Sequence, residues 1–371
     1  MTRSGPPLDL VAGARPNFMK LAPVVRALAG QAKIPFRIVD TGQHYDPSMN
    51  DVFFQQLGIP APEVHLEVGS GSHGAQTAHI LERYEAHLLQ ARPAATVVFG
   101  DVNSTLACAL AAVKLGVGVV HVEAGLRSLD RTMPEEINRL LTDAVADLLL
   151  VSEASGLEHL KREGIPDQRV RLVGNVMIDT LLSELPAARE LAVARRLGLL
   201  DKGYGFLTLH RPSNVDDPRT LEGLLDLLEE LSARLPIVFP VHPRTLASAR
   251  RAGLADRLAP GGSRLICLGP TPYRDTISLV AGAAVVLTDS GGLQEETSVL
   301  RVPCITLREN TERPVTVTQG TSRIVGNDPD RIRAAFTDAL AGRWSKGGDI
   351  PLWDGRAGQR VADEIAAWLD A

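Results

Sequence analysis

The sequence predicts an α/β protein with two Rossmann-like, doubly wound domains around a central cleft. Short apolar runs alternate with amphipathic, Ala/Leu-rich segments, a pattern typical of parallel strands covered by helices on both faces. The alternation is interrupted near residue 175 and resumes near residue 204. The chain has 371 residues, more than a single hydrophobic core usually serves, so two domains are expected.

The order of the elements supports this division. In the first domain, residues 1–174, strand-like runs lie at 8–12, 37–40, 96–100, 118–122, 147–152 and 169–174. Helix-like segments lie between them at 16–31, 77–90, 104–116 and 155–164. In the second domain, residues 175–355, a helical connection at 177–199 precedes strand-like runs at 204–210, 235–241, 264–269, 283–290 and 302–307. A helix within residues 356–371 could pack on either domain and is placed with the first.

The composition excludes several classes of protein. Lys and Arg number 39 against 44 Asp and Glu, a net charge of −5, so no nucleic-acid-binding surface is expected. The N-terminus lacks the apolar core of a signal peptide, and no run reaches membrane-spanning length, which predicts a cytoplasmic protein without membrane association. Cys108, Cys267 and Cys304 lie far apart, so we expect reduced thiols and no metal site.

Six polar clusters directly follow predicted strands. They are GARPNFMK (13–20), GDVNST (100–105), Glu123, HRPSN (210–214), HPR (242–244) and DSGGLQEE (289–296). Ligands of open parallel sheets bind beyond the carboxyl ends of the strands. All six clusters are therefore expected where a ligand would bind. In DSGGLQEE, Ser290, Gly291 and Gly292 lead into a helix whose free N–H groups favour phosphate, and Glu296 could bind a sugar or ribose diol. A glycine turn followed by solvated acids is the alternative.

Cations and carboxylates also gather at these strand ends. Arg15 and Lys20 flank the start of a helix, where cations are disfavoured unless an anion lies between them. Three basic residues at adjacent strand ends, His210, Arg211 and His242, favour contact with an anion. The alternative is that the arginine is a solvated surface charge and that the histidines are structural. Carboxylates that share a site repel, and the raised pKa of one of them suits a general acid or base. The candidate carboxylates are Asp101, Glu123, Glu135 and Glu136, of which the last two could simply be acids of a helix N-terminus.

One motif competes with this interpretation. GSGSHG, residues 69–74, matches the glycine pattern of dinucleotide-binding loops. The preceding run, EVHLEV, alternates with charged residues and is not the first strand, so a flexible glycine loop is the better interpretation. No cofactor is therefore expected.

Taken together, the clusters resemble the non-hydrolysing UDP-N-acetylglucosamine 2-epimerases. The resemblance runs through GARPNFMK, TGQHYD, GDVNST, HVEAGLRS, MPEEINR, VGNVMIDT, LHRPSN, PVHPR, TDSGGLQEE and ENTERP, in order, over nearly the whole chain. It implies the glycosyltransferase-B architecture without a nicotinamide cofactor, a UDP-N-acetylhexosamine substrate and a homodimer. The residues that it assigns to catalysis are Asp101, Glu123, Glu135 and His210, and those that it assigns to substrate binding are Arg15, Lys20, Ser290, Gly291, Gly292, Glu296 and Arg313.

The resemblance also implies the reaction. UDP is eliminated from C1 while a base removes the C2 proton, and UDP then re-adds to 2-acetamidoglucal after proton delivery to the opposite face. Removal of a proton from one face of the sugar and delivery to the other require two proton carriers. This would explain why the carboxylates come from separate strands. The segment PYRDTIS has Thr276 where the family places an aromatic residue against uracil, with Tyr273 nearby.

A second UDP-GlcNAc site, used for activation in many bacterial members, is a further implication. The matching residues are Gln43, His44, Gln76, Glu136, Arg211 and His242. Ala75 replaces an expected Arg and Asp46 a customary Gln, so a weakened second site is expected. Three other functions stay open: a hydrolysing epimerase that releases ManNAc and UDP, a glycosyltransferase of the same architecture, and a catalytically silent UDP-sugar binder.

Overall fold

The structure is a computed structural model that describes residues 5–32, 34–43, 54, 56–260 and 264–371, with the backbone alone at residues 15, 31 and 32. It divides into two compact units. The first contains residues 1–180 and 351–371, and the second contains residues 181–350. Helix α7 (Val176–Glu190) crosses the boundary between them.

A seven-stranded parallel sheet forms the centre of the first unit. Its strand order is β3-β2-β1-β4-β5-β6-β7, so the order along the chain reverses between β1 and β4. The strands are β1 (Leu8–Ala12), β2 (Phe36–Asp40), β3 (Val64–His65), β4 (Thr96–Phe99), β5 (Val119–Ala124), β6 (Leu148–Val151) and β7 (Val170–Leu172). Because β1 and β4 are connected to opposite sides of the sheet, their carboxyl ends mark a crevice where ligands bind in such folds.

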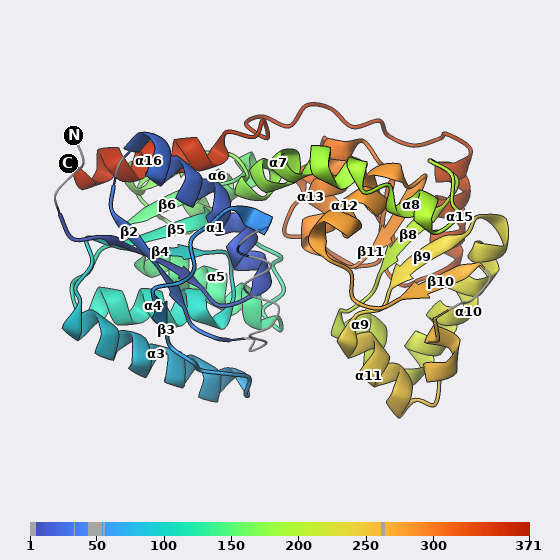
Figure 1. Ribbon diagram of the computed structural model, residues 1–371, viewed down its shortest axis with the longest axis horizontal. Helices are drawn as coiled ribbons and strands as arrows, with labels where there is room; N and C mark the ends of the chain where they lie inside the picture. The colour runs from blue at the N-terminus through green and yellow to red at the C-terminus, as the bar shows by residue number, and fades with distance from the viewer. Residues whose placement is uncertain (1–4, 33, 44–53, 55, 261–263) are drawn as a thin grey trace. The chain divides into compact units, whose positions relative to one another are not determined.

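Helices cover both faces of this sheet. They are α1 (Arg15–Ala27), followed by the π-helical turn η1 (Leu28–Ala32), then α3 (His73–Gln90), α4 (Asn103–Lys114), α5 (Pro134–Val145), α6 (Ala154–Arg162), the 3₁₀ turn η2 (Asp167–Arg169) and α16 (Ala357–Leu369). In Figure 1, α3 and α4 lie along one side of the sheet, and α1 and α16 lie along the other. The strands β1, β4, β5 and β6 are fully buried, as the continuous apolar runs predict.

The C-terminal helix α16 packs against α1. A Cβ at Gly358 would lie 2.7 Å from the Pro23 carbonyl oxygen, so only glycine permits this close approach. The first amides of α16 donate to the buried carboxylate of Asp179, at 3.0 Å from Ala357 and 2.7 Å from Gly358. An acid at a helix N-terminus satisfies amides that have no partner within the helix, and it therefore fixes the end of the chain to the first unit.

The second unit contains a six-stranded parallel sheet in the order β10-β9-β8-β11-β12-β13. The strands are β8 (Gly205–Thr208), β9 (Ile237–Pro240), β10 (Leu265–Leu268), β11 (Val285–Thr288), β12 (Cys304–Thr306) and β13 (Ser322–Ile324). Its order reverses between β8 and β11. The two sheets confirm the predicted doubly wound α/β class.

Both faces of the second sheet are buried. Phe206 packs in one apolar cluster and its neighbour Leu207 in another, as expected for successive residues of a strand. The covering helices are α8 (Val193–Arg196), α9 (Pro212–Val215), α10 (Pro218–Arg234), α11 (Pro243–Arg251), η3 (Ala255–Leu258), α12 (Tyr273–Gly282), α13 (Gly291–Leu300), α14 (Val315–Thr318) and α15 (Pro329–Leu340).

The structure bears on the predictions about the cysteines and about membrane-spanning segments. All three cysteines are buried and unpaired, which confirms the prediction of free thiols. None of the described helices combines the length and apolar character needed to cross a membrane.

Candidate active site

In the first unit, Glu123 lies at the end of β5. It is buried, has a φ of 74°, and lies at a register shift between Val122 and Ala124 of β5. A bulge and a left-handed backbone at a non-glycine residue are strained features that turn a side chain away from the regular strand direction. The Lys20 ammonium, from α1, forms an ion pair with this carboxylate.

Gly100 makes room for that ion pair. Its φ is +66°, and a Cβ there would lie 2.5 Å from Lys20 Nζ and 3.2 Å from Glu123 Oε2. The turn between β4 and α4 thus passes directly over the pair. Asp101, the next residue, retains 27% of its side-chain exposure while it accepts a hydrogen bond from Arg139 of α5. The structure therefore brings Lys20, Asp101 and Glu123 to the same edge of the sheet.

Glu135 and Glu136 occupy the first turn of α5 but have different surroundings. Glu136 is buried and accepts hydrogen bonds from the Ser128 N–H at 2.9 Å and from Arg139 Nη2 at 2.7 Å. Burial alone would raise the pKa of Glu136, but these donors lower it below its ordinary value. Glu135 is half-buried. Both positions suit helix N-terminal acids, and Glu136 also fixes the loop that begins at Ser128.

Arg139 connects two of the predicted carboxylates. This buried guanidinium donates to Asp101 through Nη1 and to Glu136 through Nη2 and Nε. Asn138, beside it, donates to the Asp101 carbonyl oxygen at 2.9 Å. Helix α5 therefore fixes both the side chain and the backbone of Asp101.

The remaining predicted residues of the first unit lie around the starts of α1, α3 and α4. Helix α1 begins at Arg15 with proline next, as predicted, but the Arg15 side chain and all of His44 lie outside the described residues. Gln43 Oε1 accepts from Ser104 Oγ at 2.7 Å, and the buried Gln76 amide donates to the Gly69 carbonyl at 2.9 Å. Strand β3, which precedes the glycine motif of residues 69–74, lies at the edge of the sheet, away from the β1–β4 crevice.

In the second unit, His210 and Asp289 meet where the strand order reverses. His210 follows β8, Asp289 follows β11, and Nδ1 of the imidazole lies 2.8 Å from Oδ1 of the carboxylate. Asp289 is fully buried, and its other oxygen also accepts from Asn214 Nδ2 at 3.1 Å. Burial alone would raise the pKa of Asp289, but the His210 contact and the amides of the HRP turn lower it.

His242 and Arg211 lie close to this pair. The rings of His210 and His242 are 5.3 Å apart between centroids. Burial, and then the neighbouring His210, lower the pKa of His242, and its Nδ1 accepts the Arg244 amide at 3.1 Å. His242 is therefore neutral near pH 7 with its proton on Nε2. Arg211 Nη2 lies 3.4 Å from Oε1 of the buried Glu312.

The N-terminus of α13 combines free amides with a buried cation. Ser290 is its N-cap residue and makes no side-chain capping bond, and a Cβ at Gly292 would meet no atom within 4 Å. At Gly291 a Cβ would lie 2.6 Å from Arg313 Nη1, so the guanidinium packs directly on the helix start. Arg313 is itself paired with Glu295 through Nε at 2.5 Å, and the uncapped amides and the open space at Gly292 are the features that suit a phosphate.

Glu296, one turn further along α13, faces Tyr273. The tyrosine hydroxyl donates to Glu296 Oε1 at 2.7 Å. Burial raises the pKa of Glu296 to about 7; the tyrosine opposes the shift and the adjacent Glu295 adds to it. Its carboxylate therefore changes charge near neutral pH.

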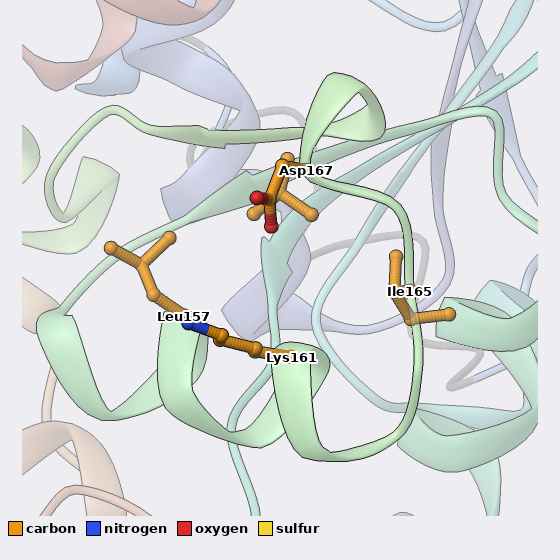
Figure 2. Close-up of a pocket in the computed structure, with 5 residues that line it drawn as sticks. Leu157, Lys161, Ile165 and Asp167 are labelled. Atoms are coloured by element: carbon orange, nitrogen blue, oxygen red, sulfur yellow. The ribbon is translucent and has the colours of Figure 1, made fainter.

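A separate pocket lies on the first unit between α6 and β7 (Figure 2). It is lined by Leu157, Lys161, Ile165, Asp167 and Val170, none of which belongs to the strand-end clusters. Throughout the described part of the chain, no three His, Cys, Asp or Glu side chains are grouped as metal ligands.

Some residues of the site were not predicted from the sequence. They are His121, Arg139, Asp143 and Asp289, all of which are buried. Arg139 and Asp289 hold predicted residues directly, whereas His121 and Asp143 bond to Gly100 and Gly125, next to them. Asp289 could have been predicted from the sequence, since it begins the DSGGLQEE cluster immediately after a strand. The others lie inside a strand or helix pattern, where a polar residue gives no indication of its partner.

Comparisons with known proteins agree on one family. The family model described as UDP-N-acetylglucosamine 2-epimerase matches residues 26–366. A Methanocaldococcus jannaschii relative, UDP-N-acetylglucosamine 2-epimerase, is 39% identical over 363 residues, which cover 95% of this chain and 97% of the relative. A Pseudomonas aeruginosa relative, UDP-2,3-diacetamido-2,3-dideoxy-D-glucuronate 2-epimerase, is 38% identical over 360 residues, which cover 96% and 98%.

Solved structures show the same fold. The crystal structure of the M. jannaschii UDP-GlcNAc 2-epimerase in complex with UDP-GlcNAc and UDP matches with a TM-score of 0.90 at 39% identity, covering 97% of this chain and 99% of that one. A glycotransferase of kitacinnamycin matches with a TM-score of 0.55 at 14% identity, covering 98% and 99%. This second likeness extends to the fold alone and is consistent with the predicted glycosyltransferase-B architecture.

Proposed function

The chain belongs to the UDP-N-acetylglucosamine 2-epimerase family, and we propose that it reversibly inverts C2 of UDP-N-acetylglucosamine. The observation that carries this proposal is the convergence of Asp101, Glu123 and Lys20 at the strand ends of the first unit. A C2 epimerase needs proton carriers held in fixed positions, and these are carboxylates from two adjacent strands.

The chemistry explains why more than one carboxylate is needed. C2 is not adjacent to a carbonyl group, so its proton is not acidic enough for simple removal. Elimination of UDP from C1 allows a base to take the C2 proton and gives 2-acetamidoglucal. Protonation of C2 on the other face and return of UDP to C1 then complete the inversion. We assign proton transfer to Asp101, Glu123 and Glu135, with Lys20 holding Glu123 in place.

The second unit supplies the features that a departing diphosphate requires. Charge develops on UDP as the C1–O bond breaks, and preorganised cations and amides stabilise such charge. The start of α13, with Ser290, Gly291 and Gly292, offers amides, and Arg313 offers a buried guanidinium next to them. We assign Arg15 and His210 to the same diphosphate.

Glu296 is assigned to the ribose. An ionised carboxylate accepts hydrogen bonds from a diol, and its two oxygens can serve both Tyr273 and a ribose hydroxyl. The Tyr273 hydroxyl is thus engaged with Glu296. Thr276 lies three residues further along α12, where the family has its aromatic residue.

One observation supports an alternative substrate, a UDP-diacetamido-glucuronate. The P. aeruginosa relative, named for a 2,3-diacetamido-2,3-dideoxyglucuronate substrate, is 38% identical, nearly the same as the M. jannaschii relative at 39%. Both reactions, as the names state, are epimerisations at C2. They differ at C3 and C5 of the sugar, so the choice between them rests on residues that contact those positions.

The test is incubation of the purified protein with each UDP-sugar in D₂O, followed by proton NMR. We expect UDP-GlcNAc to give UDP-ManNAc that carries deuterium at C2. Free ManNAc with UDP would indicate the hydrolysing reaction instead. Turnover of the diacetamido-glucuronate alone would assign the chain to that substrate, and turnover of neither would leave a UDP-sugar binder and overturn the proposal.

A weakened second nucleotide site is part of the proposal. Gln43, Gln76, Glu136, Arg211 and His242 are present, but residue 75 is an exposed alanine in the first turn of α3. Loss of one guanidinium removes one charge-assisted contact with a diphosphate. We expect UDP-ManNAc alone to react without a long lag, and added UDP-GlcNAc to accelerate the reaction only modestly. Strict dependence on UDP-GlcNAc would contradict this.

A further inference from the structure

His121 is fully buried in β5, two residues before Glu123, and both of its ring nitrogens face oxygen atoms. Nδ1 lies 2.6 Å from Asp143 Oδ1, and Nε2 lies 2.8 Å from the Gly100 carbonyl oxygen. The sequence gives no indication of this arrangement, because His121 stands within an apolar run.

The geometry determines the protonation of the ring. A carbonyl oxygen only accepts, so Nε2 must carry a proton to approach Gly100 at 2.8 Å. On the other side, Asp143 Oδ2 accepts from the Gly125 N–H at 3.0 Å and pairs with Arg127 Nη2 at 2.7 Å. Burial would raise the pKa of Asp143, but the contacts with His121 and Arg127 lower it. Because Oδ2 already faces two donors, the short contact between Nδ1 and Oδ1 holds one proton, and Nε2 carries a second.

The charges of this buried network balance one another. Asp143 of α5 faces His121 and Arg127, and Glu163, after α6, pairs with Arg127 at 2.6 Å. The His121–Asp143 pair and the Arg127–Glu163 pair are each neutral overall. The Lys20–Glu123 pair, next to Gly100, is neutral as well. Buried ionisable groups of this kind are tolerated because each has a partner of opposite charge or a hydrogen-bonding partner.

The network fixes the two turns that carry the proposed proton carriers. The bond from His121 sets the orientation of the Gly100 carbonyl, and therefore the direction in which the chain enters Asp101. Asp143 holds the Gly125 amide, two residues after Glu123, where φ is +82°. We propose that His121 is a positioning residue whose Nε2–H, bonded to the Gly100 carbonyl oxygen, holds the turn of Asp101 in register with the bulge of Glu123. This rests on the proposed epimerase function.

Two substitutions separate the two bonds of His121. The side-chain amide of Gln reaches the place of Nε2, so His121→Gln can still donate to Gly100, whereas the amide of Asn reaches the place of Nδ1, so His121→Asn can still donate to Asp143. We expect His121→Asn to lower kcat by roughly 10- to 100-fold, because small displacements of catalytic groups have effects of this size. His121→Gln should retain kcat within about fivefold. KM should stay nearly constant in both, and His79→Gln, an exposed replacement on α3, serves as the control.

The readouts distinguish positioning from general damage. Wild-type kcat in His121→Asn, or an equal fall in both variants, would overturn the proposal. The ¹⁵N NMR spectrum of the histidine-labelled wild-type protein is a second test that needs neither variant to fold. Its His121 ring, assigned through replacement of the other histidines, should show a proton on Nε2, and an Nε2 without a proton would overturn the proposal. A wild-type protein without epimerase activity but with this protonated Nε2 would count against the proposed function alone.

Discussion

His210 and Asp289 lie at the ends of adjacent parallel strands, with the imidazole Nδ1 2.8 Å from the carboxylate Oδ1. The other oxygen of Asp289 accepts from the backbone N–H groups of His210 and Arg211 at 2.9 and 2.8 Å. One buried carboxylate therefore fixes both the histidine ring and the turn that carries it. Nε2, on the far side of the ring, is left as the nitrogen that can act on a ligand.

Replacement of Asp289 by Asn should weaken UDP binding. An amide has only one accepting oxygen, so it cannot serve the imidazole and the two backbone amides together. We expect a roughly 10- to 100-fold loss of UDP affinity in calorimetry, the size expected for loss of a charged, buried hydrogen bond. Asp256→Asn, at an exposed position of the same unit, is the matched control. Unchanged affinity in Asp289→Asn would show that His210 does not depend on this contact.

The two glycines at the start of α13 should respond differently to alanine. In Gly291→Ala the new methyl group would lie 2.6 Å from Arg313 Nη1, so the guanidinium must move even when no ligand is present. In Gly292→Ala the methyl group enters open space, so only a ligand would meet it. We expect Gly291→Ala to lower both the melting temperature and UDP affinity, and Gly292→Ala to lower affinity alone. Equal behaviour of the two variants would contradict the phosphate assignment.

The strands of both sheets were largely predictable from the sequence, and two edge strands show where the prediction fails. Runs such as LDLVA and TVVFG are continuous and apolar because both faces of the strand are buried. Strand β13 (Ser322–Ile324) was not predicted, since it has three residues, two of them polar, and lies at the end of the sheet beside β12. The run EVHLEV, a possible strand before the glycine motif, forms a strand at Val64–His65, at the sheet edge beside β2.

The positions of the site residues were predictable, but their partners were not. Asp101 and Glu123 follow strands, and the rule that ligands bind at strand ends identifies them without a structure. Arg139 contacts Asp101 from 38 residues away, and Asp143 contacts His121 from 22 residues away. Such contacts depend on how α5 packs on the sheet, and no local pattern records that packing.

The proposed proton carriers should affect turnover and leave UDP binding intact. Asp101→Asn and Glu123→Gln retain the size of each side chain and remove its ability to carry a proton. We expect kcat to fall by roughly 100-fold or more in each variant, since positioned acids and bases contribute at least that much. UDP affinity, measured by calorimetry, should remain within about threefold of the wild type. Near-normal turnover in both variants would exclude the carboxylate mechanism.

Glu296 should make the stability of the folded protein depend on pH. Burial raises its pKa to about 7 from an ordinary value of 4.5, so between these pH values the folded state binds more protons than the unfolded state. The free energy of unfolding therefore falls as pH rises through this window and levels off above pH 7. The difference between the two pKa values corresponds to roughly 3 kcal/mol.

Glu296→Gln is the variant that isolates this effect. The amide oxygen of glutamine can still accept the hydrogen bond from Tyr273, but the side chain no longer ionises. We expect the variant to melt at a higher temperature than the wild type at pH 8, and the difference to shrink at pH 5. Asp143, Asp289 and Glu136, whose pKa values are lowered, lose their contributions only under more acidic conditions and do not interfere. An equal difference in melting temperature at both pH values would show that Glu296 is ionised throughout this range.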